Sequence, residues 1–185
     1  MTVKWERFSG STDIFAVRLS FIPDPDQSLA ADVDDAASWG ALQIWVEGQN
    51  LCSHVDQGEV LQSVHWYLLP FLEWLADVWN PLPHEEKLPN SNTAESAATA
   101  LAVTRVAPPL VAEADVLVWE EEWYEWRMRH AIRAARTGGL FPNVVFRRLR
   151  DLIEVSWEDE RLAGTPRGFH FSAGTGVARL APPLR

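Results

Sequence analysis

Histidine, cysteine and acidic side chains are the residue types that most often bind metals or carry out acid–base chemistry, and this sequence holds several short groups of them. The pair His84-Glu85 begins as the zinc-binding helix of a metallopeptidase does, but Leu88 stands where the second histidine is required. Cys52 and His54 could supply two metal ligands, yet no second pair follows at the spacing of a zinc site. These groups therefore predict neither a metal centre nor a catalytic residue.

An acidic stretch between residues 24 and 35 has part of the ligand spacing of a calcium-binding loop. Leu29 occupies the sixth position, where such a loop needs glycine, and Asp35 occupies the last position, where it needs glutamate. Glycine-rich phosphate-binding loops and the GxSxG turn of serine hydrolases do not occur in the sequence either. We therefore predict no bound metal and no cofactor.

Arginine is the residue type with the most uneven distribution. Residues 127–150 contain seven Arg and no acidic residue, whereas residues 1–126 contain 5 Lys and Arg against 21 Asp and Glu, a net charge of −16. The forked guanidinium group binds carboxylates and phosphates through paired hydrogen bonds. The arginines therefore predict a surface that binds an anion or an acidic partner, or else they neutralise the acidic half of the chain itself. The candidate binding residues are Arg129, Arg133, Arg136, Arg147, Arg148 and Arg150, together with Trp119, Trp123 and Trp126.

A helix predicted over residues 118–137 positions the three tryptophans and the first arginines. At about 100° per residue, the tryptophans share one face of this helix with His130, and Tyr124 and Met128 lie on a second apolar face. Acidic residues precede the arginines along the helix, which is the order that the helix dipole favours. A helix with two apolar faces is either buried between layers or shared with a partner.

The rest of the pattern predicts an α+β fold in one domain, residues 1–185, with an antiparallel sheet packed against two main helices at 61–79 and 118–137. Alternating apolar residues predict strands at 14–22 and 39–47, a returning strand at 51–55, a hairpin of 143–149 with 152–157, and short strands near 169–171 and 177–180. Pro70 predicts a kink within the helix at 61–79. Residues 80–115 form a connecting segment rich in proline and alanine, with a short helix expected at 93–101.

The composition bounds the class of protein. Apolar residues make up 47% of the 185 residues and charged residues 23%, as in a globular protein, and ten Trp are available for its core or for an interface. Cys52 is the only cysteine, so an internal disulfide is excluded. The sequence has neither a signal-peptide pattern nor an apolar stretch of about 18 residues. We expect a cytoplasmic protein without a membrane partner, and its net charge of −10 disfavours nucleic-acid binding outside the arginine-rich segment.

Several segments together resemble a known type of protein block. They are 129–136 (RHAIRAAR), 138–148 (GGLFPNVVFRR), 154–157 (EVSW), Trp39-Gly40 and 65–70 (HWYLLP). Over about residues 40–157 they look like an uncharacterised N-terminal block of some bacterial proteins, including ones with an ImmA/IrrE-type metallopeptidase region downstream. The resemblance implies an accessory, sensing or docking module, linked to phage defence or stress regulation. The HExxH helix of that peptidase region is absent from this sequence, so the resemblance transfers no catalytic residue.

The expected function is therefore a non-catalytic interaction or regulatory module of a larger bacterial assembly, with a protein partner or a longer polypeptide. Two alternatives stay open. One is a sensor that binds an anion or nucleic acid through the arginines between 127 and 150. The other is an enzyme whose active site none of the familiar motifs reveals.

Overall fold

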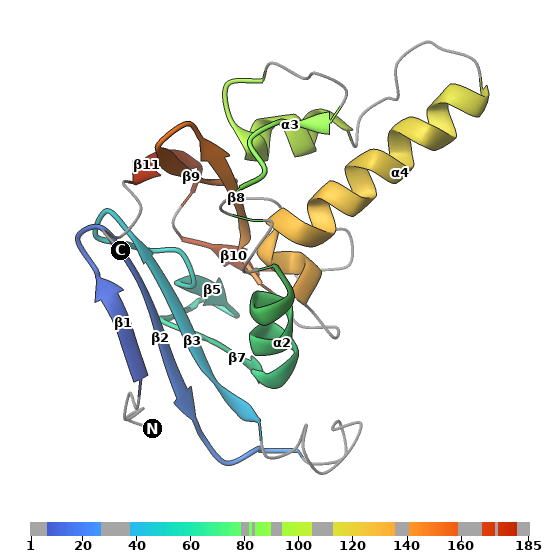
Figure 1. Ribbon diagram of the computed structural model, residues 1–185. Coiled ribbons are helices and arrows are strands. Elements are labelled where there is room, and N and C mark those ends of the chain that lie inside the picture. Colours follow the sequence, from blue (N-terminus) through green and yellow to red (C-terminus); the bar gives the residue numbers. More distant parts are fainter. Residues whose placement is uncertain are drawn as a thin grey trace.

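The computed structural model describes residues 7–26, 38–78, 82, 84–89, 94–104, 113–135, 141–158, 168–172 and 174–180. Within these ranges, antiparallel sheets and helices form the expected α+β fold (Figure 1). None of the helices in the described part of the chain is long and apolar enough to cross a membrane.

The first sheet is built on the two strands that the sequence predicts most clearly. Its strands are β1 (Arg7–Ser11), β2 (Phe15–Phe21), β3 (Trp39–Val46), β4 (Gln49–Asn50) and β7 (Val64–Tyr67). The central strand β3 pairs with β2 from Gly40 to Val46, and β4 and β7 share its other edge. Leu42, Ile44 and Val46 are every second residue of β3, and all three lie in one hydrophobic core, which we call the main core. This agrees with the two-residue period of side-chain direction along a strand.

The helix expected at 61–79 is shorter than predicted, because its first half forms strands. Leu61 ends β6 (Glu59–Leu61), β7 follows, and α2 (Leu69–Val78) begins only at Leu69. Val64 and Leu68 fit the apolar spacing of a helix, but they are buried from β7 and from the turn after it. Pro70 stands in the first turn of α2, where its missing N–H has no helical partner to lose. The predicted kink at Pro70 is therefore wrong: the proline marks the start of the helix.

The returning strand expected at 51–55 is also different in the structure. Leu51 and Cys52 form a turn, in which the side-chain Oδ1 of Asn50 accepts a hydrogen bond from the Cys52 N–H at 3.1 Å. The chain is thereby turned away from β3. The next strand, β5 (His54–Asp56), pairs with β6 and with β10 (His170–Phe171) in a second sheet.

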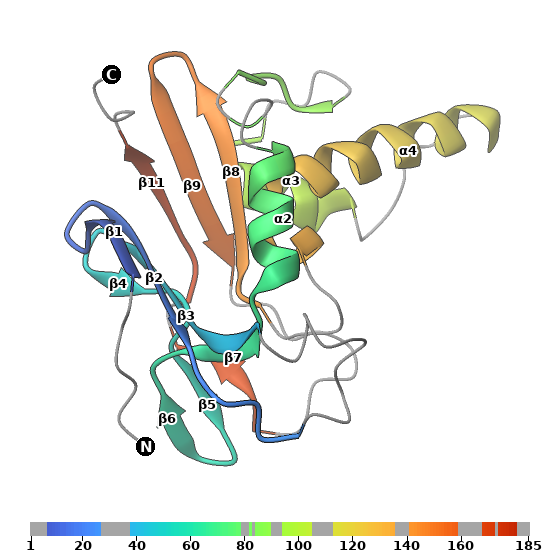
Figure 2. The ribbon, with the colours of Figure 1, turned by 60° about the horizontal axis from the view of Figure 1, so that its bottom comes forward.

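The third sheet confirms the predicted hairpin and the strand predicted near 177–180, while the strand predicted near 169–171 is β10 of the second sheet. Its order is β11 (Gly176–Leu180), β9 (Leu152–Glu158) and β8 (Asn143–Leu149), all antiparallel. Arg150 lies in the tight turn between β8 and β9 with a φ of 57°. Both views place this sheet between the first sheet and the helices α3 and α4 (Figure 2).

Both faces of the third sheet are buried, against two different cores. Val144 of β8, with Val155 and Trp157 of β9, faces the main core, which includes side chains from β3 and α2. Val145 of β8 faces a second core with α3 (Ala97–Thr104) and the tryptophans of α4 (Glu113–His130). Since successive side chains of a strand point to opposite faces, the sheet supplies both cores from neighbouring positions.

The helices α3 and α4 begin and end at other residues than predicted. The first starts at Ala97 rather than at 93, because Ser96 caps it: the Ser96 Oγ accepts a hydrogen bond from the Thr99 N–H at 3.1 Å. The second starts at Glu113, earlier than the predicted 118, and ends at His130. Ala131 then forms a β-bridge to Val145, and residues 132–135 form the 3₁₀ helix η3 (Ile132–Ala135). The last two residues of the predicted helix, 136 and 137, lie outside the described part of the chain.

Candidate functional site

The tryptophans of α4 form a row that attaches the helix to the third sheet. Trp119 contacts Trp123 edge to face, and Trp123 contacts Trp126 in the same way. Trp123 and Trp126 are buried in the second core, with 4% and 1% of their surface exposed, and Trp119 is half-buried at its margin. Trp123 and Trp126 therefore stabilise the fold and leave no surface for a partner.

His130 continues this row and connects three segments of the chain. Its ring lies against the indole of Trp126, and its Nδ1 is 2.9 Å from the carbonyl oxygen of Phe146 in β8. Its Nε2 is 3.1 Å from the Oε2 of Glu85. Burial lowers the pKa of His130, although its hydrogen bond to the carboxylate of Glu85 acts in the opposite direction. His130 is thus a buried histidine, both of whose ring nitrogens lie beside oxygen atoms, and it joins α4, β8 and the segment 84–89.

Glu85 is the acidic partner of Arg129. The guanidinium group of Arg129 donates from Nε to Oε2 at 3.0 Å and from its second terminal nitrogen to Oε1 at 2.9 Å. These hydrogen bonds are the main reason that the pKa of Glu85 lies below its usual value. Glu125, one turn before Arg129, lies 3.8 Å from the same guanidinium group. Arg129 is therefore neutralised by this chain's own carboxylates.

The segment that resembles the start of a zinc motif binds the arginine-rich segment instead. Glu85 holds Arg129, and the Oε1 of Glu86 accepts a hydrogen bond from the backbone N–H of Arg150 at 3.0 Å. His84 is exposed. Sequence reasoning did not find this contact, and the only signal for it was two adjacent acids in a chain whose bases are concentrated elsewhere.

Arg147 is buried beneath α3 and is paired with Glu154. Its guanidinium group donates to the Oε2 of Glu154, while the Oε1 of Glu154 accepts the N–H of Ala97 at 2.7 Å. The neighbouring Ser156 Oγ accepts the N–H of Ala98 at 3.0 Å. The first turn of a helix has N–H groups without helical partners, so Glu154 and Ser156 cap α3 from the strand β9. Arg147 therefore has a structural role.

The remaining arginines do not form one surface with these two. The Nε of Arg133 donates to the carbonyl oxygen of Phe141 at 2.9 Å. Arg148 follows Arg147 on β8 and points to the opposite face of the sheet, since strand side chains alternate. Arg150 is exposed in the hairpin turn, and Arg136 lies outside the described residues. The candidate arginines therefore do not meet on one binding surface. The contacts described for their guanidinium groups are with carboxylates and carbonyl groups of this chain.

The face of α4 opposite the tryptophan row is where apolar side chains meet solvent. We call Leu117, Glu120, Glu121, Tyr124 and Met128 the outer face of α4. Leu117 and Tyr124 are 65% and 55% exposed, and Val118 on the flank of this face is 56% exposed. At about 100° per residue, the outer face lies roughly 150° around the helix from the tryptophans. In both ribbon views the first half of α4 projects beyond the rest of the described fold (Figure 1).

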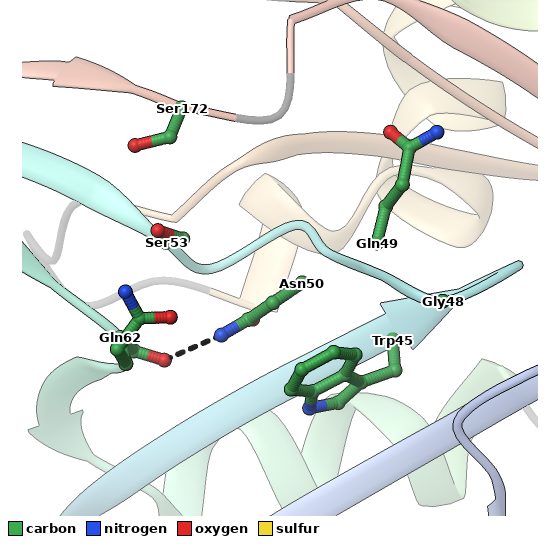
Figure 3. Close-up of a pocket in the computed structure, with 7 residues that line it drawn as sticks. All are labelled: Trp45, Gly48, Gln49, Asn50, Ser53, Gln62 and Ser172. Atoms are coloured by element: carbon green, nitrogen blue, oxygen red, sulfur yellow. Dashed lines mark hydrogen bonds between the residues drawn. The ribbon is translucent and has the colours of Figure 1, made fainter.

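A shallow, neutral hollow lies at a separate place, beside the turn between β3 and β4 (Figure 3). Its volume is about 370 Å³, and its lining consists of Trp45, Gly48, Gln49, Asn50, Ser53, Gln62 and Ser172. The side-chain amide nitrogen of Asn50 donates to the backbone oxygen of Gln62 at 2.7 Å, which fixes one wall. The lining offers amides, hydroxyl groups and one indole, and no group that titrates near neutral pH.

Two further findings concern metal binding and nucleophilic chemistry in the described part of the chain. Within it, no group of three or more His, Cys, Asp and Glu side chains could hold a metal ion. Burial raises the pKa of the Cys52 thiol to about 12, so this thiol stays protonated at neutral pH and is a poor nucleophile.

Comparisons with known proteins add no relative to this picture. No protein-family model, no curated protein and no solved structure matches this chain.

Proposed function

We propose that this protein is a non-catalytic interaction module that binds a protein partner, or a longer polypeptide, through the outer face of α4. The observation that carries the proposal is the two-sided character of this helix. One side is held in the second core by Trp123 and Trp126, and the other side presents Leu117 and Tyr124 to solvent.

The energetics of exposure support this assignment. Burial of one large apolar side chain stabilises a complex by about 1.5–3 kcal/mol relative to leaving it in water. Single exposed apolar residues are ordinary, but Leu117, Val118 and Tyr124 lie within two turns of one helix, which projects from the fold. A cluster of this kind is typical of an interface.

The wider setting of the proposal is a regulatory part of a larger bacterial assembly, linked to phage defence or stress. This setting rests on the resemblance of residues 40–157 to a bacterial accessory block. Binding of an anion or nucleic acid through the arginines is supported less well, because Arg129 and Arg147 already hold Glu85 and Glu154.

Site-specific photocrosslinking in the cells that make this protein tests the proposal. A benzophenone side chain at position 124 should crosslink to one discrete partner, and the additional substitution Leu117→Glu should remove that product. The matched control is position 60, because Val60 on β6 is 60% exposed and lies away from α4. Equal crosslinking from positions 124 and 60, or a product that Leu117→Glu leaves unchanged, would show that the outer face of α4 is not the interface.

A further inference from the structure

The charges on α4 indicate the chemistry of the partner. Five of its carboxylate side chains are exposed: Asp115, Glu120, Glu121, Glu122 and Glu125. Among its described cations, Arg127 is exposed and stacks over the ring of Tyr124 at 5.4 Å, whereas Arg129 is held by Glu85. The solvent-facing side of α4 is therefore apolar along its middle and acidic along its margins.

The spacing of the apolar residues indicates the shape of the partner. Leu117, Tyr124 and Met128 stand at positions i, i+7 and i+11, and so form a stripe about 16 Å long on one side of the helix. Stripes of this spacing pack against another helix, whose own ridge of side chains fits beside them. Glu120 and Glu121 lie on the two sides of this stripe, where they would face the flanks of a helix bound along it.

From these two observations we infer that the outer face of α4 binds a basic amphipathic helix, which packs its apolar side on Leu117 and Tyr124 and sets Lys or Arg beside Glu120 and Glu121. This inference rests on the proposed function of α4 and names the partner's chemistry. Complementary charge accelerates association and excludes partners of like charge, so it also explains why an exposed apolar stripe is bordered by acids.

A second copy of this chain fits the outer face less well. Each copy carries a net charge of −10, and two outer faces brought together would set the carboxylates of Glu120 and Glu121 of both copies in one interface. Nucleic acid is disfavoured at this face for the same electrostatic reason. For a basic helix, by contrast, the carboxylates of Glu120 and Glu121 are attractive, and they outnumber Arg127, the single exposed cation among the described residues of α4.

The test uses the whole protein and two synthetic helical peptides that share one leucine stripe. One peptide carries lysines on both flanks of the stripe, and the other carries glutamates. Fluorescence anisotropy of labelled peptide measures the affinity at low and at high salt. We expect the lysine peptide to bind at least about tenfold more tightly than the glutamate peptide, and to weaken as salt rises.

Two pairs of substitutions separate the outer face from the general acidity of the chain. Glu120→Gln with Glu121→Gln should weaken the lysine peptide by about tenfold. The matched control, Glu73→Gln with Asp77→Asn on the exposed side of α2, makes the same change in net charge and should leave the affinity unchanged. Tyr124→Ala should weaken both peptides, and thermal unfolding followed by circular dichroism verifies that each variant is folded.

The outcomes distinguish this inference from the proposed function. Equal affinity for the two peptides, with both lost in Tyr124→Ala, would leave α4 as an interface and overturn the basic partner. The basic partner would also be overturned if the α2 control lost as much affinity as the α4 variant, or if neither peptide bound. In either case the photocrosslinking at position 124 would remain as the test of the proposed function. A concentration-dependent dimer in sedimentation experiments, abolished by Tyr124→Glu, would replace the basic helix by a second copy.

Discussion

The imidazole of His130 lies parallel to the indole of Trp126, with ring centroids 4.3 Å apart and an angle of 8° between the rings. The stacked pair is fully buried, and the hydrogen-bond contacts of the imidazole reach Phe146 in β8 and Glu85 before α3. One end of α4 is therefore fixed by aromatic packing and by polar contacts at the same place. The side of α4 that faces away from these contacts has the exposed outer face.

Substitution Trp126→Ala should destabilise the protein by about 3–5 kcal/mol, the usual cost of removing a large buried aromatic side chain. Trp126 is 1% exposed and contacts both Trp123 and His130, so the substitution leaves a cavity in the second core. Urea denaturation measures the change in the free energy of unfolding. The control is Tyr124→Ala on the same helix, which is exposed and should change the stability by about 0.5 kcal/mol or less. Similar losses in the two variants would contradict the buried role of Trp126.

The free energy of unfolding should fall as the pH drops below about 6.5, the ordinary pKa of histidine. Burial lowers the pKa of His130 in the folded protein, so the unfolded chain binds more protons in this range. Above that pH the imidazole is neutral in both states and its contribution is constant. Glu85 adds a further loss of stability at lower pH, because its hydrogen bonds to Arg129 hold its pKa in the folded protein below the usual value.

Urea midpoints at about pH 7.5 and about pH 5.5 measure this dependence. Burial also lowers the pKa of His65. His130→Gln should therefore remove only part of the dependence of the free energy of unfolding on pH, and His65→Gln should remove another part. The variant Glu85→Gln loses a hydrogen bond that raises the pKa of His130, and it should therefore become more sensitive to acid near pH 6. An unchanged slope in His130→Gln would rule out its contribution.

Several strands and turns of this fold could be predicted because each of the patterns that indicate them lies within a few consecutive residues. Alternating apolar residues identified β2 and β3, and the turn at Arg150 identified the hairpin of β8 and β9. The segment before α2 could not be assigned in this way. Val64, Leu68 and Leu72 are spaced as in a helix, but the pairing of β7 with β3 fixes Val64 in a strand. This pairing joins residues that are distant in the sequence, and no local pattern shows it.

The candidate site shows the same limit. The sequence placed Trp119, Trp123 and Trp126 on one side of a helix, and they do lie together. Proximity in sequence suggested that Arg147 and Arg148 act together, whereas the alternation of a strand separates them. The contact of Arg129 with Glu85 spans 44 residues, so only the folded structure reveals that these opposite charges meet.

Either single substitution in the pair Arg147 and Glu154 should cost about 3–5 kcal/mol, because it leaves one buried charge without its partner. Both side chains are buried, and Glu154 also caps α3 through the Ala97 N–H. The double variant Arg147→Met with Glu154→Gln should lower the free energy of unfolding by less than the sum of its two single substitutions. A double-mutant cycle, measured by urea denaturation, gives the difference. Hydrogen exchange at Ala97 should accelerate in Glu154→Ala. Additive costs would show that the two groups do not interact.

The thiol of Cys52 should not react with a disulfide reagent in the folded protein at pH 8. Its side chain is fully buried, and burial raises its pKa to about 12, so both access and thiolate formation are blocked. Reaction should occur only through opening of the fold, and its rate should rise when urea brings the protein toward its unfolding midpoint. Unfolded protein in guanidinium is the control, in which the thiol should react at once. Rapid reaction without denaturant would mean that the turn at 51–52 opens easily, and it would make Cys52 an accessible thiol rather than part of the main core.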